Sequence, residues 1–170
     1  HVSTPQDPAS ARYGEPIYIF WLRSVWFSYL SAWHLEYERM SKAGRKWYSW
    51  HNEMLRMQIL QFLFLTVIAW FFGLFVAASF ILASCIGFLL LETVNYIEHY
   101  GLVRQKKGTQ YERTMPWHSW NSNHVLGRLM LFELSRHSDH HYIASRKYQL
   151  LRHHDDSPQM PTGYPGMMLL

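Results

Sequence analysis

The chain is poor in charged residues and rich in apolar ones. Asp, Glu, Lys and Arg make up 16% of its 170 residues, against roughly a quarter in ordinary globular proteins. Hydrophobic residues make up 49% and aromatic residues 17%. Mean hydropathy is nevertheless slightly negative, so the apolar residues must be concentrated in one region. This composition predicts a protein that is partly embedded in a membrane and partly exposed to water.

Cysteine is almost absent as well. Cys85 is the single cysteine and lies within an apolar run, which excludes a disulfide framework and any cysteine-based zinc or iron–sulfur site. A metal in this chain must therefore be held by carboxylates or by some of the 11 histidines. The formal charge of +4 is moderately basic, and the basic residues flank an apolar segment. That arrangement favours anionic lipid headgroups over nucleic acid, and we expect no nucleic-acid partner.

Residues 57–91 contain no charge at all over about 35 positions. This length is too great for one membrane span and suits two. A division near Gly73 gives two helices of roughly 17 to 18 residues, about 26 Å each, against a hydrocarbon core of about 30 Å. The alternative is a buried helical pair in a soluble protein, which the uncharged length argues against. We predict a two-helix transmembrane hairpin over residues 54–99.

Basic and aromatic residues flank this hairpin on both sides. The basic residues are Arg39, Lys42, Arg45, Lys46 and Arg56 before it, and Arg104, Lys106, Lys107 and Arg113 after it. Aromatic residues suited to the membrane interface are Trp47, Tyr48, Trp50, Tyr96 and Tyr100. The positive-inside rule therefore places both ends of the hairpin in the cytoplasm.

The remaining segments are predicted to lie outside the hydrocarbon. Residues 16–33 are aromatic-rich, but Arg23 near their middle would cost about 2.5 to 3.5 kcal/mol to insert, which favours an amphipathic helix in the interface. From Gly101 onward the chain is polar and rich in turn signals. The predicted fold is mainly α, with one domain in three parts: a cytosolic and interfacial segment (1–53), the hairpin (54–99) and a histidine-rich cytosolic lobe (100–170).

Three histidines are spaced so that they meet on one helix face. His137, His140 and His141 stand at positions i, i+3 and i+4 within Arg-His-Ser-Asp-His-His. Imidazoles on one face of a helix can converge on one or two metal ions. Asp139 lies between them and is expected to orient one ligand ring through its N–H group. The same spacing also arises by chance in histidine-rich loops.

A second signal lies where the hairpin leaves the membrane. There Glu98 and His99 stand within Asn-Tyr-x-Glu-His-Tyr-Gly-Leu, about 35 residues before Arg-His-Ser-Asp-His-His. Together these stretches resemble the paired signatures of the integral-membrane alkane hydroxylases, the histidine-box family of alkane 1-monooxygenases. His1-Val2 followed by Thr-Pro-Gln-Asp-Pro-Ala-Ser resembles the stretch just after that family's second histidine box. The stretches at 117–123 and 158–165 are also similar to the family, so the resemblance covers nearly the whole chain.

The resemblance implies a membrane enzyme with two non-haem iron ions held by about nine histidines. It would use O2, and electrons from rubredoxin and its reductase, to hydroxylate the terminal carbon of n-alkanes. We expect a multi-pass protein of the bacterial inner membrane with its metal site on the cytoplasmic side. Carried over by position, the metal ligands are His1, His99, His137, His140 and His141. Glu98 and Asp139 are expected to contact ligands rather than the metal.

The chain begins at His1 and ends in apolar residues, so we expect it to be part of a longer protein in which the remaining histidine boxes lie upstream. We expect His118 and His124 to lie near the site without binding metal. His153 and His154 are expected in a solvated turn, and His34 and His51 in the interfacial region.

Two other functions compete with alkane hydroxylation. One is a related histidine-box oxygenase of the xylene monooxygenase or fatty-acid desaturase type. The other is a membrane protein that binds or transports metal without catalysis. Transport calls for polar ligands at mid-membrane, and residues 57–91 contain no histidine or acid, which argues against it.

Overall fold

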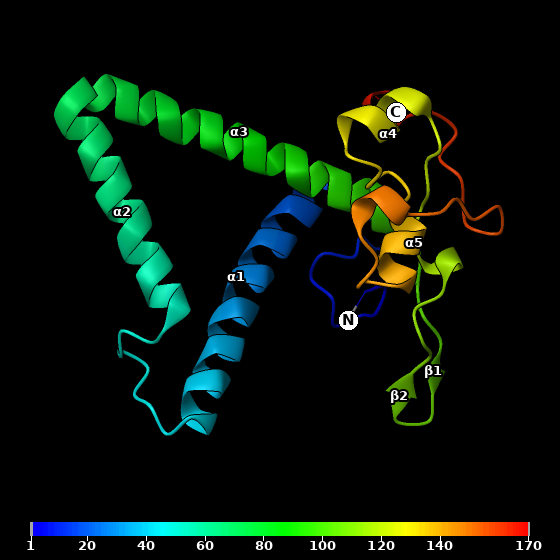
Figure 1. Ribbon diagram of the computed structural model, residues 1–170, viewed down its shortest axis with the longest axis horizontal. Helices are drawn as coiled ribbons and strands as arrows, with labels where there is room; N and C mark the ends of the chain where they lie inside the picture. The colour runs from blue at the N-terminus through cyan, green and yellow to red at the C-terminus, as the bar shows by residue number, and fades with distance from the viewer. Residues whose placement is uncertain (1, 170) are drawn as a thin grey trace. The chain divides into compact units, whose positions relative to one another are not determined.

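The computed structural model describes residues 2–169 and is mainly helical, with 56% of residues in helices, as the sequence predicts (Figure 1). The elements in chain order are α1 (Ile17–Lys42), α2 (Glu53–Phe72), α3 (Leu74–His99), β1 (Lys106–Lys107), β2 (Gln110–Tyr111), the 3-10 turn η1 (Pro116–His118), α4 (Val125–Met130), α5 (His137–Tyr142), the 3-10 turn η2 (Tyr148–Leu150) and α6 (Tyr164–Met167). The two strands form one antiparallel pair, in which Lys106 faces Tyr111.

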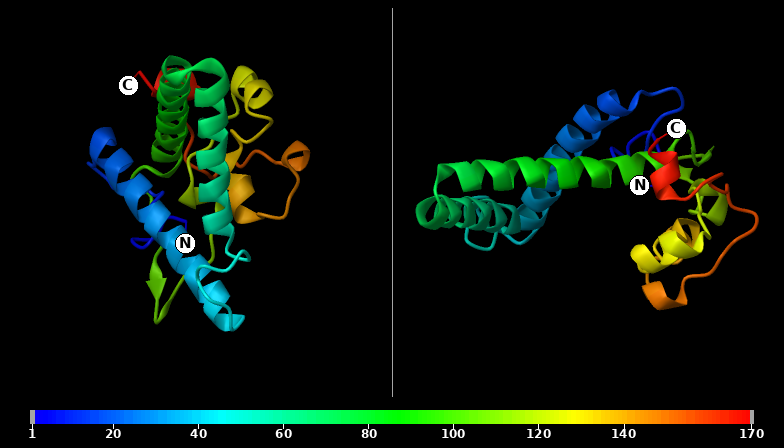
Figure 2. Two further views of the ribbon diagram at one scale, coloured as in Figure 1. Left: turned by 90° about the vertical axis from the view of Figure 1, so that its left-hand side faces the viewer. Right: turned by 90° about the horizontal axis from the view of Figure 1, so that it is seen from above.

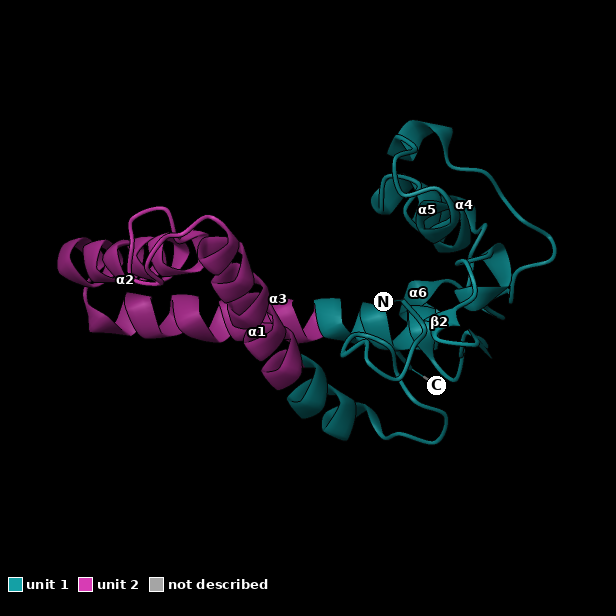
Figure 3. Cartoon of the chain, turned by 90° about the horizontal axis from the view of Figure 1, so that it is seen from below, with its two compact units in different colours: residues 1–24, 91–170 teal, residues 25–90 magenta. Residues whose placement is uncertain are grey.

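The chain divides into two compact units (Figure 3). One unit joins the residues up to Ser24 with those from Leu91 onward, and the other contains Val25–Leu90. Helices α1 and α3 each pass from one unit into the other. The three-part division at residues 53 and 99 expected from the sequence stays a prediction.

The unit Val25–Leu90 contains the apolar helices α2 and most of α3, which are joined by a sharp turn at Gly73 (Figure 1). Gly73 adopts φ +86°, a conformation that costs other residues steric strain, and its N–H donates to Ala69 O at 3.0 Å. At the other end of α2, Asn52 Oδ1 accepts from Leu55 N–H at 2.9 Å and caps the helix. The division predicted near Gly73 is confirmed.

Both apolar helices are long and hydrophobic enough to cross a membrane. No residue of α2 is buried within the described chain, so its apolar side chains have no protein core to enter. Phe64 on α2 and Phe80 on α3 make an edge-to-face ring contact at 5.5 Å. A hairpin whose outer surface is this apolar is suited to lipid.

Helix α1 extends well beyond residues 16–33. By length and hydropathy, the candidate membrane spans among the described residues are α2 and α3 and do not include α1. Its Arg23 lies within an ion pair, with Arg23 Nε 2.7 Å from Glu15 Oε1. The guanidinium also donates to Pro8 O and Ser10 O. Arg23 is therefore paired rather than left bare on an apolar helix, which lowers the cost that the sequence argument assigned to it. The interfacial position of α1 stays a prediction.

The other unit gathers short helices and loops around the carboxyl end of α3. Its small apolar core consists of Ile97, Met160 and Tyr164, which brings α6 against the end of α3 (Figure 2, red beside green). On α1, Phe20 is fully buried and its ring lies 5.3 Å from that of Tyr96. These contacts fix the last turns of α3, where the candidate site lies.

Helix α3 stops at a glycine that meets the N-terminal segment. Gly101 adopts φ +71°, and its N–H donates to Ala11 O at 3.1 Å. Two residues before it, His99 ends the helix, and Trp120 Nε1 donates to Tyr100 O at 2.9 Å. The end of α3 is thus held by the N-terminal segment, through Ala11, and by the loop that contains Trp120.

Candidate metal centre

Three imidazoles from two helices converge at the end of α3. His99 closes α3, and His137 and His141 lie one turn apart on α5. The Nε2 atom of His137 is 2.8 Å from that of His141 and 3.2 Å from that of His99. Ligand atoms of all three lie within 4.8 Å of one another, a separation that suits a shared metal ion. Among the described residues this is the one group of histidine, cysteine or acidic side chains with that geometry.

The helix predicted for the histidine triad is present and explains which rings meet. Positions i and i+4 share a face of α5, and His137 and His141 point together towards His99. His140 lies beside them, with ring centroids 5.8 Å from His137 and 5.2 Å from His141. Its ligand atoms are outside the three-histidine group. His1, the fifth predicted ligand, lies outside the described residues.

The cluster is held in the uncharged form that metal binding requires. Burial, and then the charges of the neighbouring histidines, holds the pKa of His137 well below its usual range. Burial likewise lowers the pKa of His141 to about 3. At neutral pH both rings are therefore unprotonated on one nitrogen and can offer a lone pair to a metal ion.

His99 has a buried ring nitrogen without a hydrogen-bond partner among the described residues. The side chain is 4% exposed, and the unpartnered atom is Nδ1. A buried polar atom without a partner is unfavourable and rare in native proteins. The donor set therefore fits a metal ion. Imidazole ligands alone suit iron, copper, zinc and nickel, so they do not select among these metals.

A buried carboxylate adjoins the cluster. Glu98 Oε2 lies 3.3 Å from His137 Nε2, and the Tyr164 hydroxyl donates to Glu98 Oε1 at 2.6 Å. Burial, and then the carboxylate of Glu98, raises the pKa of Tyr164, so the phenol stays protonated and remains a donor. Glu98 was expected beside the ligands and does contact one. Tyr164 was not expected, because its contact spans 66 residues of sequence and no local pattern indicates it.

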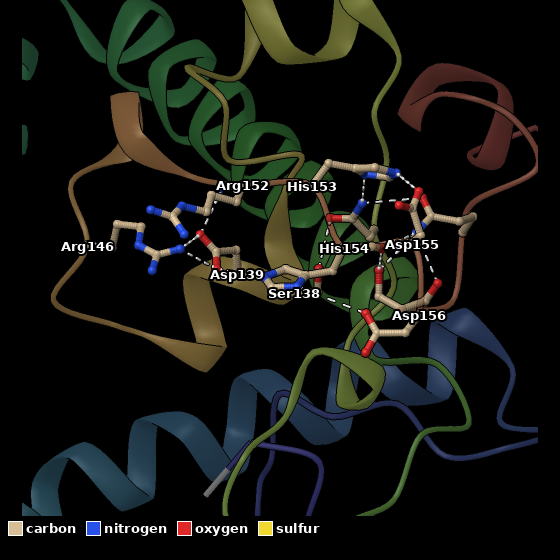
Figure 4. Close-up of polar contacts among 11 residues, drawn as sticks. Ser138, Asp139, Arg146, Arg152, His153, His154, Asp155 and Asp156 are labelled. Carbon is tan, nitrogen blue, oxygen red and sulfur yellow. Dashed lines mark hydrogen bonds and ion pairs between the residues drawn. The ribbon is translucent and has the colours of Figure 1, made fainter.

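Asp139 is buried behind the cluster and contacts a different histidine from those expected (Figure 4). Its carboxylate accepts hydrogen bonds from His154 Nε2 at 2.8 Å and from the Arg152 N–H at 2.8 Å, and it pairs with Arg146. On a helix of 3.6 residues per turn, the position between i and i+3 points away from their shared face. Burial would raise the pKa of Asp139, but these donors outweigh it and lower that pKa.

His118, His153 and His154 lie outside the three-histidine cluster and have other partners. His118 stays out of the cluster, as expected, because its Nδ1 accepts from the Met115 N–H and its Nε2 lies 3.1 Å from Glu112. The solvated turn expected at residues 153–154 is wrong. Both histidines are half-buried and hydrogen-bonded to buried partners, His153 through its Nδ1 to Asn121.

Comparison with known proteins shows which proteins the chain resembles. Residues 1–169 match the family model described as "Fatty acid desaturase". The chain is 47% identical, over its whole length, to alkane 1-monooxygenase 1 of Pseudomonas aeruginosa, and 45% identical, over 99% of its length, to alkane 1-monooxygenase 1 of Alcanivorax borkumensis. It is 26% identical, over 99% of its length, to the xylene/toluene monooxygenase hydroxylase component of Pseudomonas putida.

The chain spans about half the length of these curated relatives. It covers 45% of the Pseudomonas aeruginosa and Pseudomonas putida proteins and 42% of the Alcanivorax borkumensis protein. The similarity to the alkane 1-monooxygenases is much higher than that to the xylene/toluene enzyme. The relatives on both sides of this comparison are hydroxylating monooxygenases, the branch that the motif around His99 resembles.

Proposed function

The chain belongs to the fatty acid desaturase family, and from this premise we propose that it forms part of a membrane monooxygenase that hydroxylates the terminal carbon of n-alkanes. The observation that carries the proposal is the convergence of three imidazoles at the end of a membrane-capable helix. The names of the relatives supply the reaction: seven curated relatives between 43% and 48% identical are alkane 1-monooxygenases.

The proposed cofactor is a pair of non-haem iron ions. Their ligands in this chain are His1, His99, His137, His140 and His141. Since the relatives are about twice as long as the chain, the rest of the ligand set is expected elsewhere in the protein that carries it. When bound, iron supplies the chemistry with O2 that no amino-acid side chain provides.

The residues of the chain have separate tasks in this proposal. His137 and His141 present lone pairs because burial keeps them uncharged, and His99 brings a third ring within reach of the same point. Glu98 lies beside His137, with its Oε2 3.3 Å from Nε2, and the Tyr164 hydroxyl fixes Glu98. The apolar side chains of α2 and α3 offer a path by which a hydrocarbon dissolved in the bilayer reaches the site without crossing water.

The chain is a membrane protein, and we propose the bacterial inner membrane as its location. Basic residues on both flanks of the hairpin support a metal site on the cytoplasmic side. On that side the site can receive electrons from a water-soluble carrier, for which we propose rubredoxin with its reductase.

The test uses the whole protein that carries this chain, expressed in membranes with iron and a rubredoxin system. Alkanes from hexane to hexadecane should give 1-alkanols, detected by gas chromatography. A His141→Ala variant should give none, whereas His51→Ala, on an exposed loop, should match the wild type. Absence of alkanols from membranes that contain the iron-loaded protein would contradict the proposed reaction.

A second candidate is hydroxylation of alkylaromatic methyl groups, which the similarity to the xylene/toluene monooxygenase component supports. Toluene supplied to the same membranes separates the two. Benzyl alcohol without 1-alkanols would favour this second reaction.

A further inference from the structure

Helix α5 needs support from outside itself. It is six residues long, and isolated helices of this length are unstable in water. Yet it presents two of the three converging imidazoles, whose Nε2 atoms are 2.8 Å apart. The groups that hold the back of α5 therefore decide where those nitrogens point.

The strongest hold on α5 comes through Asp139, whose exposure is 0%. One carboxylate oxygen accepts from His154 Nε2 at 2.8 Å and from Arg146 Nη1 at 2.6 Å. The other accepts from the Arg152 N–H at 2.8 Å. Figure 4 shows these donors arriving from the segment that follows α5. A buried carboxylate with three donors fixes both the helix and the segment that supplies them.

The neighbouring histidine holds the same helix by a second route. Ser138 Oγ donates to Asn121 Oδ1 at 3.0 Å, and Asn121 Nδ2 lies 2.9 Å from His153 Nδ1. Asn121 and Ser138 are both fully buried. Adjacent histidines thus reach consecutive residues of α5: His154 contacts Asp139 directly, and His153 reaches Ser138 through Asn121.

The segment also has a hold that does not involve His154. Arg136 Nη1, just before α5, donates to Leu151 O at 2.7 Å, and Leu151 is 2% exposed. Removal of the His154 ring therefore leaves the segment attached at Leu151 and takes away one of the three donors to Asp139. This separation allows the role of the ring to be tested.

We propose that His154 is a positioning residue of the metal centre. Through Asp139 it sets the orientation of α5, and so the direction in which His137 and His141 present their Nε2 atoms. This inference rests on the metal role proposed for the cluster. Groups that hydrogen-bond metal ligands directly change metal affinity about 10- to 100-fold when removed. His154 acts one step further away, through Asp139, so we expect a loss at the lower end of that range.

The experiment measures Fe(II) binding and the Mössbauer spectrum of the purified whole protein, with thermal unfolding followed in parallel. His154→Ala is expected to weaken Fe(II) binding by about 10-fold or more and to change the quadrupole splitting of the bound iron. His154→Gln keeps an N–H donor of similar reach, so it should recover most of the affinity and a wild-type spectrum. His34→Ala is the matched control, because its side chain is 70% exposed and contacts Glu38.

Wild-type affinity and spectrum in His154→Ala would overturn the inference. So would equal losses in the Ala and Gln variants at an unchanged unfolding midpoint. If His154→Ala does not accumulate, the Gln variant decides: a wild-type spectrum supports the role, and lost iron overturns it. A wild-type protein that binds no Fe(II) would overturn the metal role as well, whereas iron binding without alkanol formation would overturn only the proposed reaction.

Discussion

The buried pair of Glu98 and Tyr164 fixes the surroundings of His137, one of the proposed metal ligands. Both side chains are at most 5% exposed, and they come from segments far apart in the sequence. A buried polar group that loses its hydrogen-bond partner costs about 1 to 3 kcal/mol. Loss of the phenol hydroxyl should therefore be felt both in stability and at His137, which Glu98 contacts.

Tyr164→Phe tests this contact with little change in volume. The free energy of unfolding should fall by about 1 to 3 kcal/mol, because the buried carboxyl group of Glu98 loses its hydrogen-bond partner. Chemical unfolding of the purified protein measures it. Tyr13→Phe, at a side chain 88% exposed, should change stability little. Equal effects of the two substitutions would show that the hydrogen bond to Glu98 contributes nothing measurable.

The sequence predicted the converging residues better than the residues that hold them. His137 and His141 follow from helix periodicity, and His99 from its place in a motif. Tyr164, His154 and Asn121 could not be predicted, because their contacts join segments between 15 and 66 residues apart. Two histidines beside two aspartates looked like a solvated turn, since local composition cannot reveal a buried carboxylate elsewhere in the chain.

Among the elements, the end of α3 depends on the backbone conformation of one glycine. Gly101 has φ +71°, and a Cβ built there would lie 3.3 Å from Cδ2 of Tyr13. The left-handed conformation costs other residues about 1 to 2 kcal/mol. Gly108 has a similar φ of +65° with open space around it. It therefore serves as a matched position without the contact.

Gly101→Ala should destabilise the protein more than Gly108→Ala does. Both substitutions strain the backbone, but only the one at Gly101 must also displace Tyr13. Gly101 also lies two residues from His99. We expect a lower unfolding midpoint and weaker Fe(II) binding for Gly101→Ala, with unchanged Fe(II) binding for Gly108→Ala. Identical midpoints and iron affinities would mean that the contact with Tyr13 does not matter.

The sequence predicted the two hairpin helices better than it predicted α1. The uncharged run and Gly73 were enough to predict two helices and their junction, because length and a single glycine decide both. The extent of α1 was underestimated, since polar residues beyond Trp33 still suit a helix that an apolar pattern does not mark. The pairing of Arg23 with Glu15 depends on a loop that no periodicity indicates.

For the whole molecule, the account requires that both flanks of the hairpin lie on one side of the membrane. In a Cys85→Ala background, cysteines placed at Lys46 and Lys107, both exposed, should react with an impermeant thiol reagent only from the cytoplasmic side. A cysteine at Leu74, 80% exposed next to the turn, should react only from the opposite side. Opposite accessibility of positions 46 and 107 would refute the hairpin.

The central claim is that the converging histidines hold catalytic iron, and the iron content of the purified whole protein tests it most directly. The wild type and His51→Ala should each retain iron and form 1-alkanols in reconstituted membranes. His137→Ala, which removes the ring in contact with both His99 and His141, should lose most of its iron and form no alkanol. A His137→Ala protein with full iron content and undiminished alkanol formation would contradict the account.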